Sequence, residues 1–203
     1  MPTIGYDPDF APISFTAEDG EAEGRAINTL REAAERAGVE CRFVPVELLK
    51  QDAFLEAGIV DVLAAMALTP ERCERFNMSA PYLDTGAAWF ALKSFDPELV
   101  PAGTSVVTPA AGPLNSVVSA RWPHLNVLAA TGYDDALKQV VEGGAMAATL
   151  NIDVGRFLCE RDFSDQFMLP ESPFFEVSLA LACRKGRRGG QLDQLFGAIG
   201  FAD

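Results

Sequence analysis

Short apolar runs alternate along the first part of the chain with segments whose apolar residues recur at helical spacing. The runs Thr3–Tyr6, Cys41–Val46 and Ile59–Met66 are short enough to predict strands. The segments Ala26–Ala37 and Leu48–Ala57 have helical spacing, and a glycine follows each of them as a helix-ending residue. This part of the chain therefore reads as strand, helix, strand, helix, strand.

The same alternation continues after a short helix that is predicted over Thr69–Arg75, with a proline at its first position. Further strands are predicted at Ala87–Leu92, Ser105–Thr108, Asn126–Ala129, Ala145–Leu150 and Phe175–Cys183. Further helices are predicted at Leu114–Arg121, Asp134–Gly143, Asp153–Glu160 and Leu192–Ile199. The segment Phe95–Gly103 contains two prolines and is interpreted as a linker. The pattern predicts an α/β fold of two βα units, joined by the extended segments around Trp89 and Leu179.

Charge narrows the possible partners. The formal net charge is -13, which argues against nucleic acid or an anionic membrane surface as a partner. The one dense basic run, Arg184–Arg188, is short and is interpreted as a solvated turn. No run reaches the roughly 20 apolar residues of a membrane span. No signal peptide is visible, so we expect either a leader that has been removed or a domain of a longer protein.

Histidine and cysteine usage excludes several kinds of chemistry. The single histidine, His124, leaves no base for a serine–histidine triad and disfavours histidine-bearing zinc sites. The four cysteines are scattered without a CxxC pair, and we expect buried free thiols: Cys41, Cys73, Cys159 and Cys183. We therefore expect no metal and no cofactor.

The most informative position is Arg72, which follows the third predicted strand. Small residues at Ala65 and Ala67 precede it and leave room for a bound molecule. A guanidinium group presents a planar fork of donors that suits a carboxylate. The alternative is a structural ion pair with Glu71 or Glu74.

Several motifs occur in an order that resembles the type 2 periplasmic solute-binding fold, family 3, which comprises the polar amino-acid binding proteins of ABC importers. The opening segment Gly5–Ile13 is similar to the first motif of that family. Further matches are Gly58, Asp61, Thr69 and Arg72, followed by Asn77–Tyr82 and, near the end, Arg184–Gly186. The resemblance extends over nearly the whole chain and is more specific in the first half.

The resemblance implies two lobes that are joined by two crossing strands and close on a ligand between them. Residues 1–92 and 178–203 would form lobe one, and residues 93–177 would form lobe two. It further implies an extracytoplasmic, periplasmic protein that captures a small carboxylate or amino-acid-like ligand. The expected partner is a membrane permease or a signalling domain, and we expect a monomer that binds no nucleic acid.

The resemblance also assigns site residues in lobe one. Arg72 matches the arginine that binds the ligand carboxylate, and Phe10 matches the aromatic residue that packs on the ligand. Asp7 matches an acid that can reach a ligand side chain, and Leu48 matches an apolar wall. Ala65 and Ala67 occupy positions where the family has small polar residues.

In lobe two, the matching loop is Pro109–Pro113, which contributes Ala111 and Gly112 at a helix start but lacks the hydroxyl groups of the family. Backbone N–H groups at that helix start can still bind an anion. Asn151 falls where the family has the acid that takes the ligand ammonium, and an amide cannot complete that ion pair. A carboxylate without an amine, or a more apolar acid, is therefore a candidate ligand, unless Asp153 or Asp7 replaces the missing acid.

Two functional classes remain open. The leading one is a binding protein, either the receptor of an ABC importer or the sensor domain of a signalling receptor. The short C-terminal end at residues 201–203 fits an excised sensor domain. The other class is a cyclohexadienyl dehydratase-like enzyme on the same fold, for which Glu176 is the nearest candidate acid. We expect Glu176 to be a solvated carboxylate, so no catalytic residue is assigned.

Overall fold

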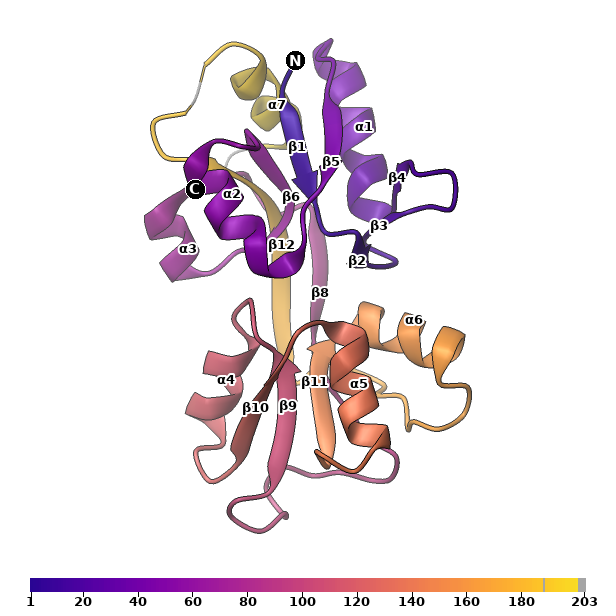
Figure 1. Cartoon of the computed structure of the whole chain (residues 1–203). Coiled ribbons are helices and arrows are strands. Elements are labelled where there is room, and N and C mark those ends of the chain that lie inside the picture. The colour runs from indigo at the N-terminus through magenta and orange to yellow at the C-terminus, as the bar shows by residue number, and fades with distance from the viewer. Residues whose placement is uncertain (188, 201–203) are drawn as a thin grey trace. The chain divides into compact units, whose positions relative to one another are not determined.

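The computed structural model describes residues 1–187 and 189–200. Arg188 of the predicted basic turn and the C-terminal residues 201–203 lie outside the described part. The chain forms two compact units, one made of Met1–Asp84 and the chain from Val177 onward, the other of Thr85–Glu176. Strands β8 (Leu83–Phe90) and β12 (Phe175–Arg184) each begin in one unit and end in the other (Figure 1).

The sheet of the first unit has three parallel strands. They are β5 (Arg42–Pro45), β1 (Thr3–Tyr6) and β6 (Val62–Ala67), with β1 paired to both of the others. β12 runs antiparallel to β6 and also pairs with the short β7 (Phe76–Met78). Because β1, β5 and β6 are parallel, their carboxyl ends lie at one edge of the sheet.

Helices cover both faces of this sheet. α1 (Arg25–Ala37) and α7 (Gln191–Ile199) contribute Leu30 and Phe196 to one buried cluster, which also contains Ile4 of β1. The 3-10 turn η1 (Leu48–Lys50) leads into α2 (Gln51–Ala57), which buries Leu55 in a second cluster with Met66 of β6. Strand side chains point alternately to the two faces, so one strand serves both clusters.

The second unit repeats this plan on a smaller scale. β9 (Ser105–Pro109) lies between β10 (Asn126–Ala130) and β11 (Ala147–Asn151) and is parallel to both, while β8 pairs antiparallel with β11. Its helices are α4 (Leu114–Arg121), α5 (Tyr133–Val141) and α6 (Ile152–Asp162) (Figure 1). An aromatic cluster packs against its core, with Trp89 stacked on Phe174 at a ring-centroid distance of 5.4 Å.

The predicted α/β architecture is confirmed, and β1 and α4 have the predicted bounds. The predicted strand Ile59–Met66 was placed too early, because it begins only at Val62. Ile59 is 57% exposed, and the Asp61 carboxylate accepts a hydrogen bond from the Thr3 N–H at 3.0 Å. The strand predicted at Ala87–Leu92 was placed too late, because β8 spans Leu83–Phe90.

Three further features differ from the sequence interpretation. The segment Phe95–Gly103 belongs to the second unit, where the Phe95 ring packs at 5.0 Å from Trp89, so it is not a linker. Cys73 is exposed because it lies on the outer side of a short helix, and Cys41 is only partly buried. Tertiary pairing also creates β7 and a small sheet of very short strands: β2 (Asp9–Phe10), β3 (Ser14–Thr16) and β4 (Ala22–Glu23).

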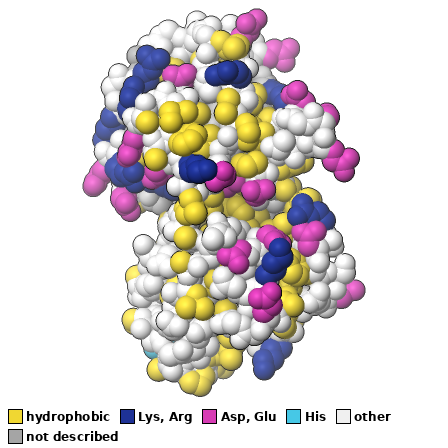
Figure 2. All heavy atoms as spheres, in the orientation of Figure 1, with side chains coloured by type: hydrophobic (Ala, Val, Ile, Leu, Met, Phe, Trp, Pro, Cys, Tyr) yellow, Lys and Arg dark blue, Asp and Glu magenta, His cyan; other side chains and the backbone are white. Residues whose placement is uncertain are grey.

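Charged side chains of both signs are interspersed on the surface that Figure 2 shows. Arg75 pairs with Asp52 at 2.8 Å and with Glu56 at 2.7 Å. In the predicted basic turn, Arg187 pairs with Asp61 at 3.3 Å. None of the helices in the described ranges has both the length and the apolar character needed to cross a membrane.

Candidate ligand-binding site

Four of the predicted site residues lie at the carboxyl edge of the first unit's sheet. Asp7 directly follows β1, Leu48 follows β5, and Ala65 and Ala67 lie in the last part of β6. The strands are held in register there, because the Val46 N–H donates to the Tyr6 carbonyl at 2.8 Å. Ligands of open α/β sheets bind outside the carboxyl ends of the strands, so this edge is a suitable place for a binding site.

Arg72 is fixed to the same edge by the start of α3 (Pro70–Arg75). Thr69 caps this helix, and its hydroxyl oxygen accepts a hydrogen bond from the Arg72 N–H at 3.3 Å. The Arg72 Nη1 donates to the carbonyl of Ala67, the last residue of β6, at 3.5 Å. The residue is partly buried, and this hydrogen bond orients its guanidinium. The local sequence achieves this with a helix cap and a proline directly after the strand.

Asp7 and Phe10 are both buried, and Asp7 shapes the turn between them. The Asp7 Oδ1 accepts a hydrogen bond from the Asp9 N–H at 3.0 Å, and the Ser14 hydroxyl donates to the Asp7 carbonyl at 2.9 Å. A carboxylate that binds a backbone N–H two residues ahead stabilises a tight turn. Asp7 therefore has a structural task in addition to the ligand contact that the resemblance implies.

The motif at Asn77–Tyr82 also proves to be structural. The Ser79 N–H donates to the Leu181 carbonyl of β12 at 3.0 Å, and the Ser79 hydroxyl oxygen accepts the Leu181 N–H at 2.9 Å. The Tyr82 hydroxyl donates to the Ala64 carbonyl of β6. Burial raises the pKa of Tyr82 far above its usual value, so the phenol stays protonated as a donor. The motif thus ties the chain after α3 to the strands that precede Arg72.

In the second unit, Ala111 and Gly112 lie beyond the carboxyl end of β9. The Ala110 N–H donates to the Ala130 carbonyl at 2.8 Å, which holds the start of this loop beside the end of β10. Gly112 has a φ of 89°, a conformation that other residues rarely adopt. Pro113 precedes α4 and gives it no side-chain cap, so the first N–H groups of α4 can serve an anion.

Asn151 is the last residue of β11 and the N-cap of α6, and it is 9% exposed. Its Oδ1 accepts hydrogen bonds from the N–H groups of Asp153 at 3.0 Å and Val154 at 3.3 Å. The amide oxygen is therefore engaged in capping the helix, and the amide Nδ2 is the group that Asn151 can offer to a ligand. A carboxylate acceptor fits this nitrogen better than an ammonium does.

Thr85 was not identified from the sequence. Its hydroxyl lies 2.6 Å from the Asp153 Oδ2 and 3.2 Å from the Asn151 Oδ1. Because a hydroxyl donates one proton, the shorter contact marks Asp153 as the acceptor. Asp153 therefore places a carboxyl group next to Asn151, and its role toward a ligand stays a prediction. No local signal distinguishes Thr85, because antiparallel pairing of β8 with β11 brings it there.

Glu176, the candidate acid of the enzyme alternative, is exposed on β12. An acid catalyst needs a pKa that burial has raised toward the working pH. An exposed carboxylate lacks that burial, so this position is better interpreted as a solvated strand residue. Among the described residues, no cluster of side chains suited to hold a metal ion is present.

Comparison with known proteins places these residues in a family context. Residues 3–187 match the model of the bacterial extracellular solute-binding proteins, family 3. The L-cystine-binding protein TcyJ of Escherichia coli (strain K12) is 23% identical over 141 residues, which is 69% of this chain and 47% of that protein. The chain thus spans about half the length of this curated relative.

Solved structures share the fold. A histidine kinase sensor domain with similarity to periplasmic binding proteins has a TM-score of 0.85 at 18% identity, over 98% of this chain and 88% of that one. The ancestral amino-acid-binding protein AncCDT-1, a precursor of cyclohexadienyl dehydratase, has a TM-score of 0.81 at 21% identity, over 98% and 87%. The fold is that of the type 2 periplasmic-binding proteins, with two lobes and two crossing strands.

Proposed function

Since this chain belongs to the bacterial extracellular solute-binding proteins of family 3, we propose that it captures a small carboxylate or amino-acid-like ligand outside the cytoplasm. The observation that carries the proposal is the placement of Arg72. Its guanidinium is held by the Ala67 carbonyl at the end of β6. A fixed guanidinium beside small side chains is suited to a bidentate carboxylate.

The other residues of that edge complete the proposed contacts of the first unit. Ala65 and Ala67 leave space beside the guanidinium, and Leu48 offers an apolar surface. Phe10 provides an aromatic face for the body of the ligand, and Asp7 offers a polar contact. A charge-assisted hydrogen bond to Arg72 contributes about 1.5–3 kcal/mol.

The second unit carries its own candidate groups for a ligand. We assign the N–H groups around Ala111 and Gly112 to an anionic group, and the Nδ2 of Asn151 to an acceptor such as a hydroxyl, keto or carboxylate oxygen. If the ligand carries an ammonium, Asp153 is the acid that lies next to Asn151, through their shared neighbour Thr85.

The test is a binding screen of amino acids, keto acids and dicarboxylates by thermal shift, followed by titration calorimetry of the best binder. Arg72→Met should weaken carboxylate binding at least about tenfold, because it removes the charged anchor. Arg75→Met is the matched control, since it removes the same charge from the same helix. Arg75 engages Asp52 and Glu56, so ligand affinity should not change in that variant.

Unchanged affinity in a folded Arg72→Met protein would overturn the proposal. So would equal losses in the Arg72 and Arg75 variants, because these would reflect net charge and not a specific anchor. Unfolding curves of both variants distinguish a lost contact from a lost fold.

We further propose that the bound ligand is passed to a membrane permease or reported by a signalling domain. Two comparisons support these alternatives: a relative named as an L-cystine-binding protein, and a solved histidine kinase sensor domain that shares the fold. The full-length gene discriminates between them. A leader peptide followed by this domain alone would indicate an importer receptor, and a membrane span followed by a signalling domain would indicate a sensor. Light scattering after size exclusion tests the proposed monomer.

We propose that the chain is not a dehydratase. Glu176 is exposed, and the loop around Ala111 lacks hydroxyl groups. Incubation with prephenate or arogenate should therefore yield no product absorbance. Turnover by the wild type that disappears in Glu176→Gln would contradict this proposal and favour the enzyme over the binding protein.

A further inference from the structure

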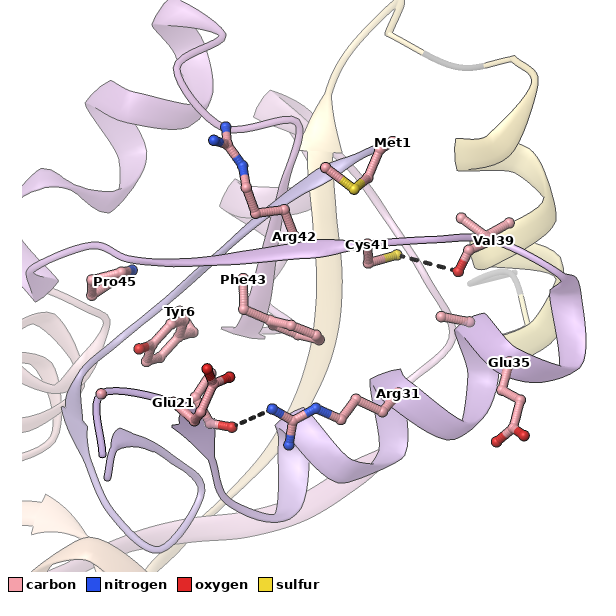
Figure 3. A pocket seen from close by; sticks show the side chains of 13 residues that line it. Met1, Tyr6, Glu21, Arg31, Glu35, Val39, Cys41, Arg42, Phe43 and Pro45 are labelled. Atoms are coloured by element: carbon pink, nitrogen blue, oxygen red, sulfur yellow. Dashed lines mark hydrogen bonds between the residues drawn. The ribbon is translucent and has the colours of Figure 1, made fainter. Parts of the chain in front are cut away.

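A cavity lies in the first unit, in a groove between α1 and β5 (Figure 3). Its volume is about 670 Å³, which is within the range of small-molecule sites. None of the predicted ligand residues lines it, so it is separate from the edge that carries Arg72. Its lining residues come from β1, β4, α1 and β5 and from the segments next to them.

The central feature of this groove is Arg31 of α1. Its Nη2 donates to the Ala22 carbonyl at 2.7 Å, and its guanidinium carbon lies 5.4 Å from the centroid of the Phe43 ring. Figure 3 shows these two side chains pointing toward one another from α1 and β5. Within the described ranges this is its one hydrogen bond, and it makes no ion pair. The guanidinium is therefore held in place while most of its N–H groups remain available.

The floor of the groove is apolar and ordered. The rings of Phe43 and Tyr6 face it, and the Tyr6 hydroxyl is held at 2.8 Å from the Thr16 hydroxyl. Ala34 and Val39 add small apolar surfaces. This setting differs from that of Arg75, whose guanidinium is neutralised by Asp52 and Glu56.

Two acids line the groove without neutralising Arg31. Glu21 and Glu35 are both exposed, and neither forms an ion pair with it among the described residues. Glu35 points away from the guanidinium in Figure 3. The acids limit the negative charge that the groove tolerates, so a single carboxylate on a compact body fits better than a polyanion.

Pairing of a partner strand along β5 is disfavoured. The strand order of this sheet ends at β5, but Pro45 has no N–H to donate. The groove is therefore suited to a small molecule.

We propose that this groove is a second ligand site, for a small molecule that carries one carboxylate on an aromatic or branched apolar body. The carboxylate accepts hydrogen bonds from Arg31, and the apolar body packs on Phe43 and Tyr6. The site is independent of the Arg72 edge, so it can be tested whether or not the proposed function holds.

Phenylacetate is the probe, and 2-phenylethanol is the matched control that lacks the carboxylate. Amide chemical shifts of 15N-labelled protein locate each probe, because binding here moves the signals of Ala22, Cys41 and Phe43. We expect saturable shifts with phenylacetate, and at least about tenfold weaker binding of 2-phenylethanol. Arg31→Met should weaken the binding of phenylacetate about tenfold as well. Arg36→Met, on the same helix but outside the groove, should leave its affinity unchanged.

Cys41 gives a second readout, because it lines the groove. Phenylacetate should slow its alkylation by iodoacetamide and leave the rate at the exposed Cys73 unchanged. The proposal is overturned if phenylacetate gives no saturable shift at these amides up to its solubility limit. It is equally overturned if wild-type protein binds 2-phenylethanol with the same affinity as phenylacetate. The same holds if folded Arg31→Met protein binds phenylacetate with the affinity of the wild type.

Discussion

At the scale of single residues, we predict that Asn151 sets which ligand charge the second unit tolerates. Asn151→Asp should shift preference from a hydroxy acid toward the corresponding α-amino acid by about tenfold, because a carboxylate can pair with an ammonium. Asp caps a helix as well as Asn does, so α6 should be preserved. Titration calorimetry of the best-binding amino acid and its hydroxy-acid analogue measures the ratio in wild type and variant.

Asp153→Asn is the matched comparison for that position. A wild-type protein that already prefers the amino acid strongly, and loses this preference in Asp153→Asn, would show that Asp153 takes the ammonium. The interpretation of Asn151 would then be wrong, although Arg72 could still anchor the carboxylate.

At the scale of elements, replacing two helical glycines by alanine should change the free energy of unfolding in opposite directions. A Cβ at Gly155 of α6 would lie 2.2 Å from the Phe90 ring, whereas one at Gly197 of α7 meets nothing within 4 Å. Gly155→Ala should therefore lower the free energy of unfolding by about 1–3 kcal/mol, through overpacking. Gly197→Ala should raise it by about 0.5–1 kcal/mol, through helix propensity. Urea unfolding measures both, and equal effects would contradict the close packing of α6 on β8.

The cap of α3 links an element to the site. Thr69→Ala should cost about 0.5–2 kcal/mol of stability, because the Arg72 N–H loses its acceptor. It should also weaken carboxylate binding, since the start of α3 orients Arg72. Thr69→Ser keeps the hydroxyl and should retain both properties. A Thr69→Ala protein with wild-type affinity would show that the cap contributes nothing to the site.

At the scale of the whole molecule, a buried thiol and a buried phenol should make the stability of the fold sensitive to alkaline pH. Burial raises the pKa of Cys159 to about 12 and raises that of Tyr82 as well. The unfolded chain loses these protons first, so stability present at neutral pH falls as pH rises above about 8.5 for the thiol and about 10 for the phenol. Urea midpoints measured across this range should decrease, and Cys159→Ala should reduce the slope. An unchanged slope in that variant would contradict the assignment to Cys159.

The sequence by itself determined the features that depend on neighbouring residues. The apolar runs and helical spacing predict the α/β alternation, and Thr69 with Pro70 predicts the start of α3 correctly. Gly38 and Gly58 end α1 and α2 in the left-handed conformation, as their positions predict. These signals are local, because a cap or a helix end satisfies backbone groups within a few residues.

Tertiary structure alone decided the contacts between residues that are distant in the chain. The pairing of β8 with β11 brings Thr85 to Asn151 and Asp153, and no pattern in the sequence marks that meeting. The short strands β2 and β7 exist because partner strands supply their hydrogen bonds, not because of their own composition. The Arg31 groove likewise depends on how α1 lies against the last strand of the sheet. Such contacts depend on packing, whereas local propensity records only what a segment prefers when alone.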